Sequence, residues 1–242
     1  MSSADGEIIE ILRAVRECLN AGRELGLEPP ALSPAALAYL EGRGTPKPPQ
    51  NPTVTLEGVR DLLGECRRCK LSSGRRNLVF GEGSLSARLV FVGEAPGREE
   101  DLQGRPFVGE AGTLLNKIIE SGMGLKREDV YICNIVKCRP PDNRKPEPDE
   151  IESCMPFLRE QLRILNPEVI CALGQVAASS LLGKKCRISD ERGKWSSFMG
   201  APLMPTFHPA FILRNPQDEK RLKKLVWADV QMIMAKMGLQ KP

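Results

Sequence analysis

Residues 88–93 read Arg88-Leu-Val-Phe-Val-Gly93, a short apolar run that ends in a glycine. Such a run is typical of a strand buried on both faces of a parallel sheet. Three further runs are expected to be strands, at residues 129–136, 168–174 and 203–207. Helical patterns alternate with them, at residues 113–120, at 148–165, from the end of the third strand to Leu182, and at 217–237. This alternation predicts an α/β fold, a three-layer αβα sandwich with a central four-stranded parallel sheet.

The carboxyl ends of the expected strands are where a functional site belongs. Open parallel sheets bind their ligands in the crevice outside these ends. Gly93, Asn134, Gly174 and Phe207-His208 all fall at such positions. We therefore look for the chemistry of this protein in the turns that follow the strands.

The first part of the 242-residue chain differs from the rest. Residues 7–25 fit an amphipathic helix, and Ser33-Pro34 has the signals that start a second one. Residues 41–53 hold four prolines and read as a linker. We expect residues 1–50 to be an N-terminal helical appendage with a Pro-rich linker, and residues 54–240 to be the main domain. The appendage either packs on that domain or binds a partner.

Composition excludes several classes of protein. No apolar run approaches the roughly 18 residues that a transmembrane helix needs. The N-terminus has neither the basic nor the apolar segment of a secretory signal, which favours a cytoplasmic location. The net charge of +4 permits nucleic-acid binding without arguing for it. With one histidine in the chain, a metal site with two histidine ligands is impossible.

Eight cysteines in a chain without an export signal are expected to be metal ligands, catalytic thiols or buried apolar residues rather than disulfides. Cys66-Arg-Arg-Cys69 has the spacing of a zinc site, an iron–sulfur cluster or a redox pair. A redox pair would follow a strand, and none is expected before Cys66. Cys138 and Cys154 are candidates for the remaining two ligands. The other four are expected to be buried free thiols, namely Cys18, Cys133, Cys171 and Cys186.

The turn after the first strand is acidic and reads Gly93-Glu-Ala-Pro-Gly-Arg-Glu-Glu-Asp101. Four carboxylates exclude a phosphate-binding loop. They suit a general base or a stabiliser of developing positive charge, with Glu94 and Glu100 as the candidates. An exposed acidic helix start, favoured by the helix dipole, accounts for Glu99 and Asp101.

Two later segments carry further candidates. Phe107 lies in Gly104-Arg-Pro-Phe-Val-Gly109 and is either part of the core or a platform on which a planar ligand stacks. His208 follows the last strand and is the only imidazole of the chain. Phe211 and Leu213, which follow it, place apolar bulk beside the cation of Arg214. This is the composition of a wedge that enters DNA.

Together these segments resemble the family 4 uracil-DNA glycosylases, which are iron–sulfur enzymes of bacteria and archaea. The likeness rests on GEAPGxxED, GRPFVG, NIVKCRPPxNRxP and HPAFILRNP and covers residues 56–237. It implies a 4Fe-4S cluster with a structural role, held by Cys66, Cys69, Cys138 and Cys154. It also implies a four-stranded parallel sheet between helices, in agreement with the fold expected above.

The resemblance also implies a uracil pocket. Phe107 stacks on the flipped base, Asn134 contacts its O4/N3 edge, and His208 and the backbone near Ala95 approach O2. Glu94, Glu100 and His208 are the implied catalytic residues. Ala95 stands where better-known uracil-DNA glycosylases have a water-activating aspartate, so that this side chain cannot act as a base.

The resulting expectation is a prokaryotic, cytoplasmic enzyme that removes uracil from single- or double-stranded DNA and leaves an abasic site. Arg139 and the basic residues of 137–145 and 214–224 are expected to hold phosphates. We expect a monomer, with a possible replication or repair protein bound through the N-terminal helix. The alternatives are a non-catalytic, polymerase-associated iron–sulfur protein that binds nucleic acid, and a hydrolase with a zinc ribbon.

Overall fold

The computed structural model describes residues 55–240. The appendage and linker expected over residues 1–50 lie outside these residues, as does Cys18. All the described residues fall in one of the two units into which the chain divides, Thr53–Pro242. No helix of residues 55–240 is long and apolar enough to cross a membrane.

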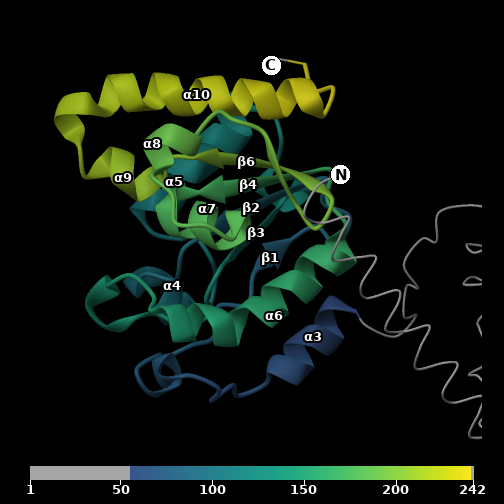
Figure 1. Ribbon diagram of the computed structural model, residues 1–242, viewed down its shortest axis with the longest axis vertical. Helices are drawn as coiled ribbons and strands as arrows, with labels where there is room; N and C mark the ends of the chain where they lie inside the picture. The colour runs from purple at the N-terminus through teal and green to yellow at the C-terminus, as the bar shows by residue number, and fades with distance from the viewer. Residues whose placement is uncertain (1–54, 241–242) are drawn as a thin grey trace, which may run out of the picture. The chain divides into compact units, whose positions relative to one another are not determined.

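A six-stranded sheet runs through the centre of the domain (Figure 1). Its strands follow the order β1-β3-β2-β4-β6-β5. The inner four are mutually parallel, whereas β1 and β5 pair antiparallel with β3 and β6 at the two edges. The strand bounds are β1 (Glu82–Gly83), β2 (Leu89–Gly93), β3 (Tyr131–Asn134), β4 (Val169–Leu173), β5 (Ser196–Phe198) and β6 (Ala201–Thr206).

The four parallel strands and the α/β class are confirmed, and the two edge strands were not expected. The inner strands have every residue buried or nearly so, which is why their sequences are continuous apolar runs. β1 has only two residues, and β5 contains two exposed serines. Neither leaves a hydrophobic pattern in the sequence from which it could be predicted.

Helices cover both faces of the sheet. In Figure 1, α10 lies on one side of it, and α3 and α6 lie on the other. The helix bounds are α3 (Leu56–Leu63), α4 (Arg98–Gln103), α5 (Glu110–Lys117), α6 (Pro148–Leu165), α7 (Gly174–Leu182), α8 (Ile188–Glu191), α9 (Pro209–Leu213) and α10 (Glu219–Lys236). The helix expected at 113–120 begins earlier and passes into a π-helical segment, Ile118–Gly122.

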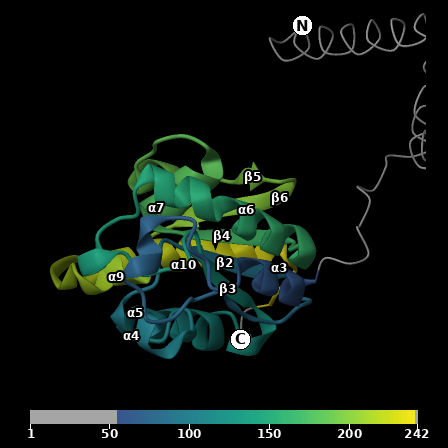
Figure 2. The same cartoon turned by 90° about the horizontal axis from the view of Figure 1, so that it is seen from below.

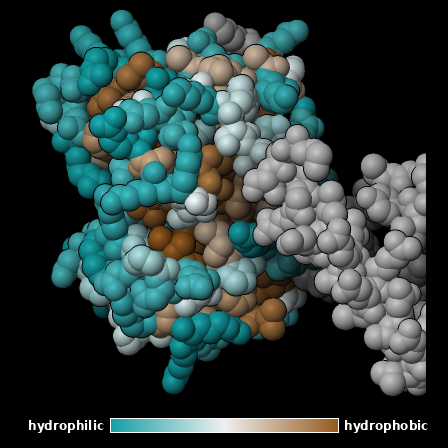
Figure 3. Space-filling model, viewed as in Figure 1, coloured by the Kyte–Doolittle hydropathy of each residue, from teal (hydrophilic) through white to brown (hydrophobic). Residues whose placement is uncertain are grey.

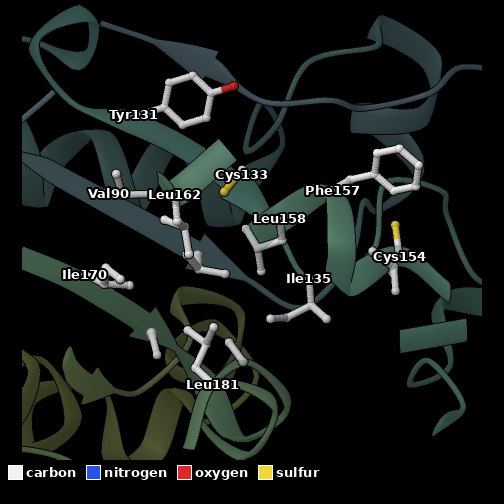
Figure 4. Packing of buried hydrophobic residues seen from close by; sticks show 14 of the residues in the cluster. Val90, Tyr131, Cys133, Ile135, Cys154, Phe157, Leu158, Leu162, Ile170 and Leu181 are labelled. Atoms are coloured by element: carbon white, nitrogen blue, oxygen red, sulfur yellow. The ribbon is translucent and has the colours of Figure 1, made fainter. Parts of the chain in front are cut away.

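Two hydrophobic clusters fill the space between the layers, because successive side chains of a strand point to opposite faces. Val90 and Val92 belong to the cluster under α3, α6 and α7, while Leu89 and Phe91 belong to the cluster under α5 and α10. Figure 4 shows the first cluster, in which Cys133 lies among leucines of α6 and Cys154 lies at the margin beside Phe157.

The register of the sheet aligns the carboxyl ends of its inner strands. Gly93 of β2 lies opposite Asn134 of β3, and Leu173 of β4 lies opposite Thr206 of β6. Figures 1 and 2 place α4, α5 and α9 toward the same end of the molecule. The turns that begin at these strand ends therefore meet at one edge of the sheet.

Candidate active site

Gly93 forms the floor of the candidate site. A Cβ atom built on this glycine would lie 2.4 Å from Asn134 Oδ1 and 2.6 Å from Phe107 Cζ. Both distances are far shorter than any real carbon contact, so only glycine lets the Asn134 amide and the Phe107 ring approach the end of β2. Asn134 and Phe107, which lie 27 positions apart in the sequence, are thus brought together over one backbone position.

Asn134 presents an unpaired acceptor to this floor. The residue is 1% exposed, and its Oδ1 has no hydrogen-bond partner within residues 55–240. A buried oxygen without a donor costs about 1–3 kcal/mol, so such atoms call for an explanation. A planar ligand with an N–H group on its edge would satisfy it. The expectation that Asn134 reads a base therefore has a geometric basis.

Phe107 occupies a backbone conformation that is unusual for its type, with φ of +51°. Its ring stacks against the His208 imidazole, with 5.5 Å between the ring centroids and 29° between the planes. Gly112 makes the turn possible, because a Cβ there would lie 1.9 Å from the Phe107 carbonyl oxygen. The buried Phe107 ring is part of the core cluster under α5 and α10 and also one wall of the site.

Glu100 holds the loop that carries Phe107. Its Oε1 accepts hydrogen bonds from the backbone N–H groups of Val108 and Gly109, both at 3.0 Å, and its Oε2 accepts one from Gly97 at 3.2 Å. On the other side of the loop, Arg127 Nη2 donates to the Pro106 carbonyl oxygen at 2.5 Å. Both carboxylate oxygens of Glu100 thus accept hydrogen bonds from the backbone. This geometry favours a positioning role for Glu100 over general acid–base catalysis.

His208 is held in one tautomer by the start of α9. It is the N-cap residue of that helix, and its Nδ1 accepts a hydrogen bond from the Ala210 backbone N–H at 3.1 Å. The proton of the neutral ring is then on Nε2, which is free to donate. The pKa of His208 is lowered to about 4, mainly by burial and in part by the positive charge of Arg214, while Glu100 opposes the shift.

Glu94 and Asp101, two other acidic residues of the turn, have different surroundings. Burial raises the pKa of Glu94, and the charges of Lys145 and Arg214 oppose that rise. Asp101 was expected to be an exposed helix-start residue, and this is wrong. It is 3% exposed, and its Oδ1 accepts hydrogen bonds from the backbone of Arg76 and Asn77. Its carboxylate therefore anchors the preceding segment to α4.

Ala95 lies between Glu94 and the turn proline, half-buried against the core. Its methyl group has no hydrogen-bonding capacity, as the sequence indicates. The backbone of this turn is fixed from β3, because the carbonyl oxygens of Gly93 and Glu94 accept hydrogen bonds from the N–H groups of Ile135 and Val136, at 2.9 and 3.2 Å.

The four cysteines singled out by their spacing lie in one region. Cys138 and Cys154 are buried, and Cys66 and Cys69 are half-buried. The pKa of Cys138 is raised to about 11, mainly by burial; Arg75 opposes this rise, and Cys154 and Cys69 add to it. Burial also raises the pKa of Cys154, with Cys69 and Cys66 adding to it. Each of the four thiols is thus within electrostatic reach of another.

Cations accompany these thiols, and no carboxylate belongs to the set. Arg75 Nη1 donates to Cys138 Sγ at 3.1 Å and to the Cys66 carbonyl oxygen at 2.8 Å. No group of three His, Cys, Asp or Glu side chains in the described part of the chain is arranged to hold a single metal ion. The four possible ligands are therefore all sulfur atoms, with the positive charge of Arg75 beside them. Outside this set, Cys133, Cys171 and Cys186 are buried free thiols, as expected.

The residues expected to contact DNA differ in how much of each is exposed. Phe211 and Leu213 of α9 are 41% and 39% exposed. The Phe211 ring stacks on Phe207 with 5.3 Å between the ring centroids. Arg214 is exposed and lies near Glu94 and His208. Arg139 donates to Asn143 Oδ1 at 2.8 Å and remains half-exposed.

One basic residue of the expected phosphate-binding segment is misassigned. Lys137 is fully buried, so it cannot reach a phosphate of the DNA backbone. Arg144 of the same segment pairs with the buried Glu150 at 2.7 Å. Lys145 is exposed and is the lysine that still fits the expectation. The sequence reasoning also missed Arg75 and Arg127, which have no motif of their own and act through contacts with distant segments.

The sequence profile of the uracil DNA glycosylase superfamily matches residues 80–231. The chain belongs to this superfamily. The match contains every pocket residue described above, together with Cys138 and Cys154. Cys66 and Cys69 lie before the matched segment.

Individual members of the superfamily are similar over most of the chain. A type-4 uracil-DNA glycosylase of Thermotoga maritima is 48% identical over 178 residues, which cover 73% of this chain and 91% of the relative. One from Saccharolobus solfataricus is 45% identical, covering 70% and 82%. A DNA polymerase of Bacillus phage SP01 is 34% identical over 57% of this chain and only 15% of its own length.

Two surface cavities of the described residues lie away from this site. One of about 590 Å³ lies between α6 and α7, and one of about 510 Å³ lies between α5 and α10. Figure 3 shows one face, where hydrophilic residues dominate and apolar residues gather toward the centre. Neither cavity is lined by Asn134, Phe107 or His208, so we assign the site from its chemistry and not from the size of a hollow.

We predict that Glu100→Gln loosens the loop of residues 106–109. An amide keeps one oxygen and turns an NH₂ group toward backbone N–H donors, so the free energy of unfolding should fall by about 1–3 kcal/mol. Amide hydrogen exchange at Val108 and Gly109 should become faster. Glu99→Gln, an exposed neighbour of the same type, is the control and should change neither quantity. Unchanged exchange in Glu100→Gln would contradict the clamp.

We predict that the single histidine titrates near pH 4 instead of pH 6.5. Its Cε1–H resonance, unambiguous in a chain with one histidine, reports this by NMR. The pKa in the folded state is below the unfolded value, so the unfolded chain binds the proton first as the pH falls. The free energy of unfolding should therefore drop by about 3 kcal/mol between pH 6.5 and 4. A midpoint near 6.5 would show that His208 is not buried.

Proposed function

We propose that the protein is a DNA-repair glycosylase that flips uracil out of DNA and hydrolyses its N-glycosidic bond, leaving an abasic site. The observation that carries this proposal is the buried, unpaired Oδ1 of Asn134, which faces the same floor as Phe107. Membership of the superfamily and the high identity to type-4 uracil-DNA glycosylases support it. Flipping costs on the order of a few kcal/mol and is easiest for a mismatched or single-stranded base.

Three side chains suit uracil specifically. The Phe107 ring offers a face on which the base stacks. The Asn134 Oδ1 accepts from N3–H, and its NH₂ donates to O4. Cytosine presents the reverse pattern, with an amino donor and an N3 acceptor, and leaves both groups mismatched. A site built around such bonds rejects the wrong base strongly, because its buried polar groups are left unpaired.

His208 stabilises the leaving group. Uracil departs as an anion with charge on O2, and a donor placed there before the reaction lowers the barrier. The neutral imidazole with its proton on Nε2 supplies that donor without giving up the proton. The low pKa of His208 means that the ring is neutral at physiological pH and contributes a dipole and not a full charge.

Glu94 is the carboxylate that remains for the sugar side. As the bond breaks, the sugar acquires oxocarbenium character and positive charge. A partly buried carboxylate at the strand end stabilises that charge and can orient the water that completes hydrolysis. We assign Glu100 to holding the loop, since its oxygens already accept from the backbone. Ala95 takes no part through its side chain.

We further propose that the type-4 relationship extends to a 4Fe-4S cluster held by Cys66, Cys69, Cys138 and Cys154. When bound, such a cluster crosslinks segments far apart in the chain and contributes to stability. Four thiols with neighbouring cations and no carboxylate fit an anionic, sulfur-ligated group.

The DNA surface and the surroundings of the enzyme complete the proposal. Arg139, Phe211, Leu213 and Arg214 contact the DNA, with the apolar pair acting as a wedge beside the vacated base. Residues 54–240 form the glycosylase unit, and the protein works as a monomer in a prokaryotic cytoplasm. Residues 1–50 serve as an appendage through which a replication or repair protein binds.

The competing function, a non-catalytic polymerase-associated protein, has less support. It is motivated by the phage DNA polymerase that shares part of the sequence. A protein that had lost activity would have no reason to keep a strained Phe107, an unpaired Asn134 and a capped His208 together. Release of uracil from an oligonucleotide, followed by alkaline cleavage of the abasic site, separates the two.

Asn134→Asp should reduce the single-turnover rate of uracil excision by roughly 100-fold or more, because it removes the donor to O4. It should also gain weak activity on cytosine, whose amino group can donate to the carboxylate. Asn166→Asp changes an exposed residue at the end of α6 and serves as the control. Excision by Asn134→Asp within a few-fold of the wild-type rate would show that Asn134 does not read the base.

Cys138→Ala should lose most of the bound iron and sulfide together with much stability, because three thiolates do not complete the coordination. Cys186→Ala removes a buried cysteine outside the proposed ligand set and should keep full iron content. Iron and sulfide analysis, with the visible absorbance of the purified protein, measures both. A fully loaded Cys138→Ala protein would exclude this ligand assignment.

A further inference from the structure

The exposed ring of the proposed wedge stacks on a second, buried ring. The planes of Phe211 and Phe207 meet at only 21°, so the two rings lie nearly parallel. Phe207 is 7% exposed and belongs to the core cluster under α5 and α10. Ile212, the next residue of α9, is buried in the same cluster. The position of the Phe211 ring therefore depends on the position of Phe207.

A cation from a different part of the chain contacts the buried ring. The guanidinium carbon of Arg192, in the turn after α8, lies over the face of Phe207 at 5.9 Å from the ring centroid. A guanidinium group at this distance is attracted by the π electrons of the ring. Arg192 Nη2 also donates to the Leu225 carbonyl oxygen of α10 at 2.7 Å. Arg192 thus joins α10 to the ring beneath the wedge.

Asp229 of α10 holds this guanidinium group in place. The Asp229 carboxylate is buried, and it accepts from Arg192 Nε at 3.0 Å and from Arg192 Nη2 on its other oxygen. Two such bonds fix the orientation of the guanidinium plane. Thr206 Oγ1 donates to the same carboxylate at 2.6 Å. Because Thr206 directly precedes Phe207, one carboxylate fixes both the main chain that leads to the ring and the cation over its face.

A glycine lets the turn after α8 reach this carboxylate. Gly193 has φ of +70°, and a Cβ atom there would lie 2.8 Å from Asp229 Oδ1. Its backbone N–H donates to the Pro205 carbonyl oxygen of β6 at 3.1 Å. The turn that carries Arg192 is consequently tied to β6 and to α10. The support beneath Phe207 is built from a central strand and a long helix, and not from loops alone.

A wedge that enters double-stranded DNA needs such a support. Removing a base from a duplex requires unpairing and unstacking, and the inserted side chain has to fill the space that the base leaves. An exposed ring on a five-residue helix is displaced by the closing base pairs unless something holds it from behind. Uracil in a single strand has no partner to lose, so its excision demands much less of the wedge.

We infer that Arg192, held by Asp229, is the positioning residue of the Phe211 wedge and thereby favours excision of uracil from double-stranded DNA. The inference rests on the proposed excision and on the proposed wedge. Arg192 acts through Phe207, which it contacts, and Phe207 in turn supports Phe211. Loss of the guanidinium group should weaken the step in which the base leaves the duplex.

The test measures single-turnover excision from a single-stranded oligonucleotide containing uracil and from the same strand paired with adenine opposite the uracil. The readout is the ratio of the duplex rate to the single-strand rate. Arg192→Gln keeps an N–H donor but loses the charge and the reach of the guanidinium group. It should lower this ratio by about tenfold, because the wedge is no longer held.

A double-mutant cycle tests the route through Phe211. Phe211→Ala should lower the ratio at least as much as Arg192→Gln does. Adding Arg192→Gln to Phe211→Ala should lower it no further, because residues that act through one another are not additive. Arg159→Gln is the matched control, since Arg159 lies over the ring of Phe198 on β5 at 5.4 Å. This control should leave the ratio unchanged.

Thermal unfolding, followed by circular dichroism, shows whether each variant is folded at the assay temperature. If Arg192→Gln is not folded, Arg192→Lys decides. It keeps a positive charge opposite Asp229 and loses the planar fork that bridges Asp229, Leu225 and the ring. The ratio should then fall several-fold.

The outcomes that overturn the inference differ from those that overturn the proposed function. An unchanged ratio in a folded Arg192 variant, or an equal loss on both substrates, would remove Arg192 from this role while uracil excision stands. Additive effects in the double variant would show that Arg192 does not act through Phe211. An unchanged ratio in Phe211→Ala would remove the wedge and this inference with it. A wild-type protein that releases no uracil from either substrate would instead remove the proposed function.

Discussion

The candidate site depends on the absence of a side chain at Gly93. β2 is an inner strand, paired with β3 on one side and β4 on the other, so its carboxyl end cannot shift to make room. Asn134 and Phe107 approach that end to distances that a single methyl group would forbid. The width of the site is consequently set by the main chain of the most rigid element, and the surrounding loops are fitted to it.

The sequence predicts the inner part of the fold well. The four parallel strands are continuous apolar runs, and α6 has a proline at its first turn and a helical pattern up to Leu165, so its bounds were predicted to the residue. The two edge strands were not predicted, because β1 is two residues long and β5 is mostly exposed. Neither has an alternation of apolar and polar residues that could be detected.

The roles of individual charges were harder to predict. Glu100 and Asp101 are adjacent in an acidic run, but one accepts hydrogen bonds from residues 108 and 109 and the other from residues 76 and 77. Which distant N–H groups meet a carboxylate is decided by tertiary packing. Lys137 looked like a phosphate ligand for the same reason, since nothing in a basic segment reveals which lysine points inward. Asn134 and His208 could be singled out in advance because strand ends are predictable positions; their roles remain predictions.

The short strands at both margins of the sheet have a consequence for the protein as a whole. A sheet that ends in a long, flat strand offers unpaired N–H and C=O groups to any other chain, and this is a route to aggregation. Here β1 ends the sheet after two residues. Gly81, just before it, and Gly83, its second residue, adopt conformations closed to most side chains. β5 ends the opposite margin after three. The parallel strands that carry the site are thus enclosed by borders too short to template the growth of a fibril.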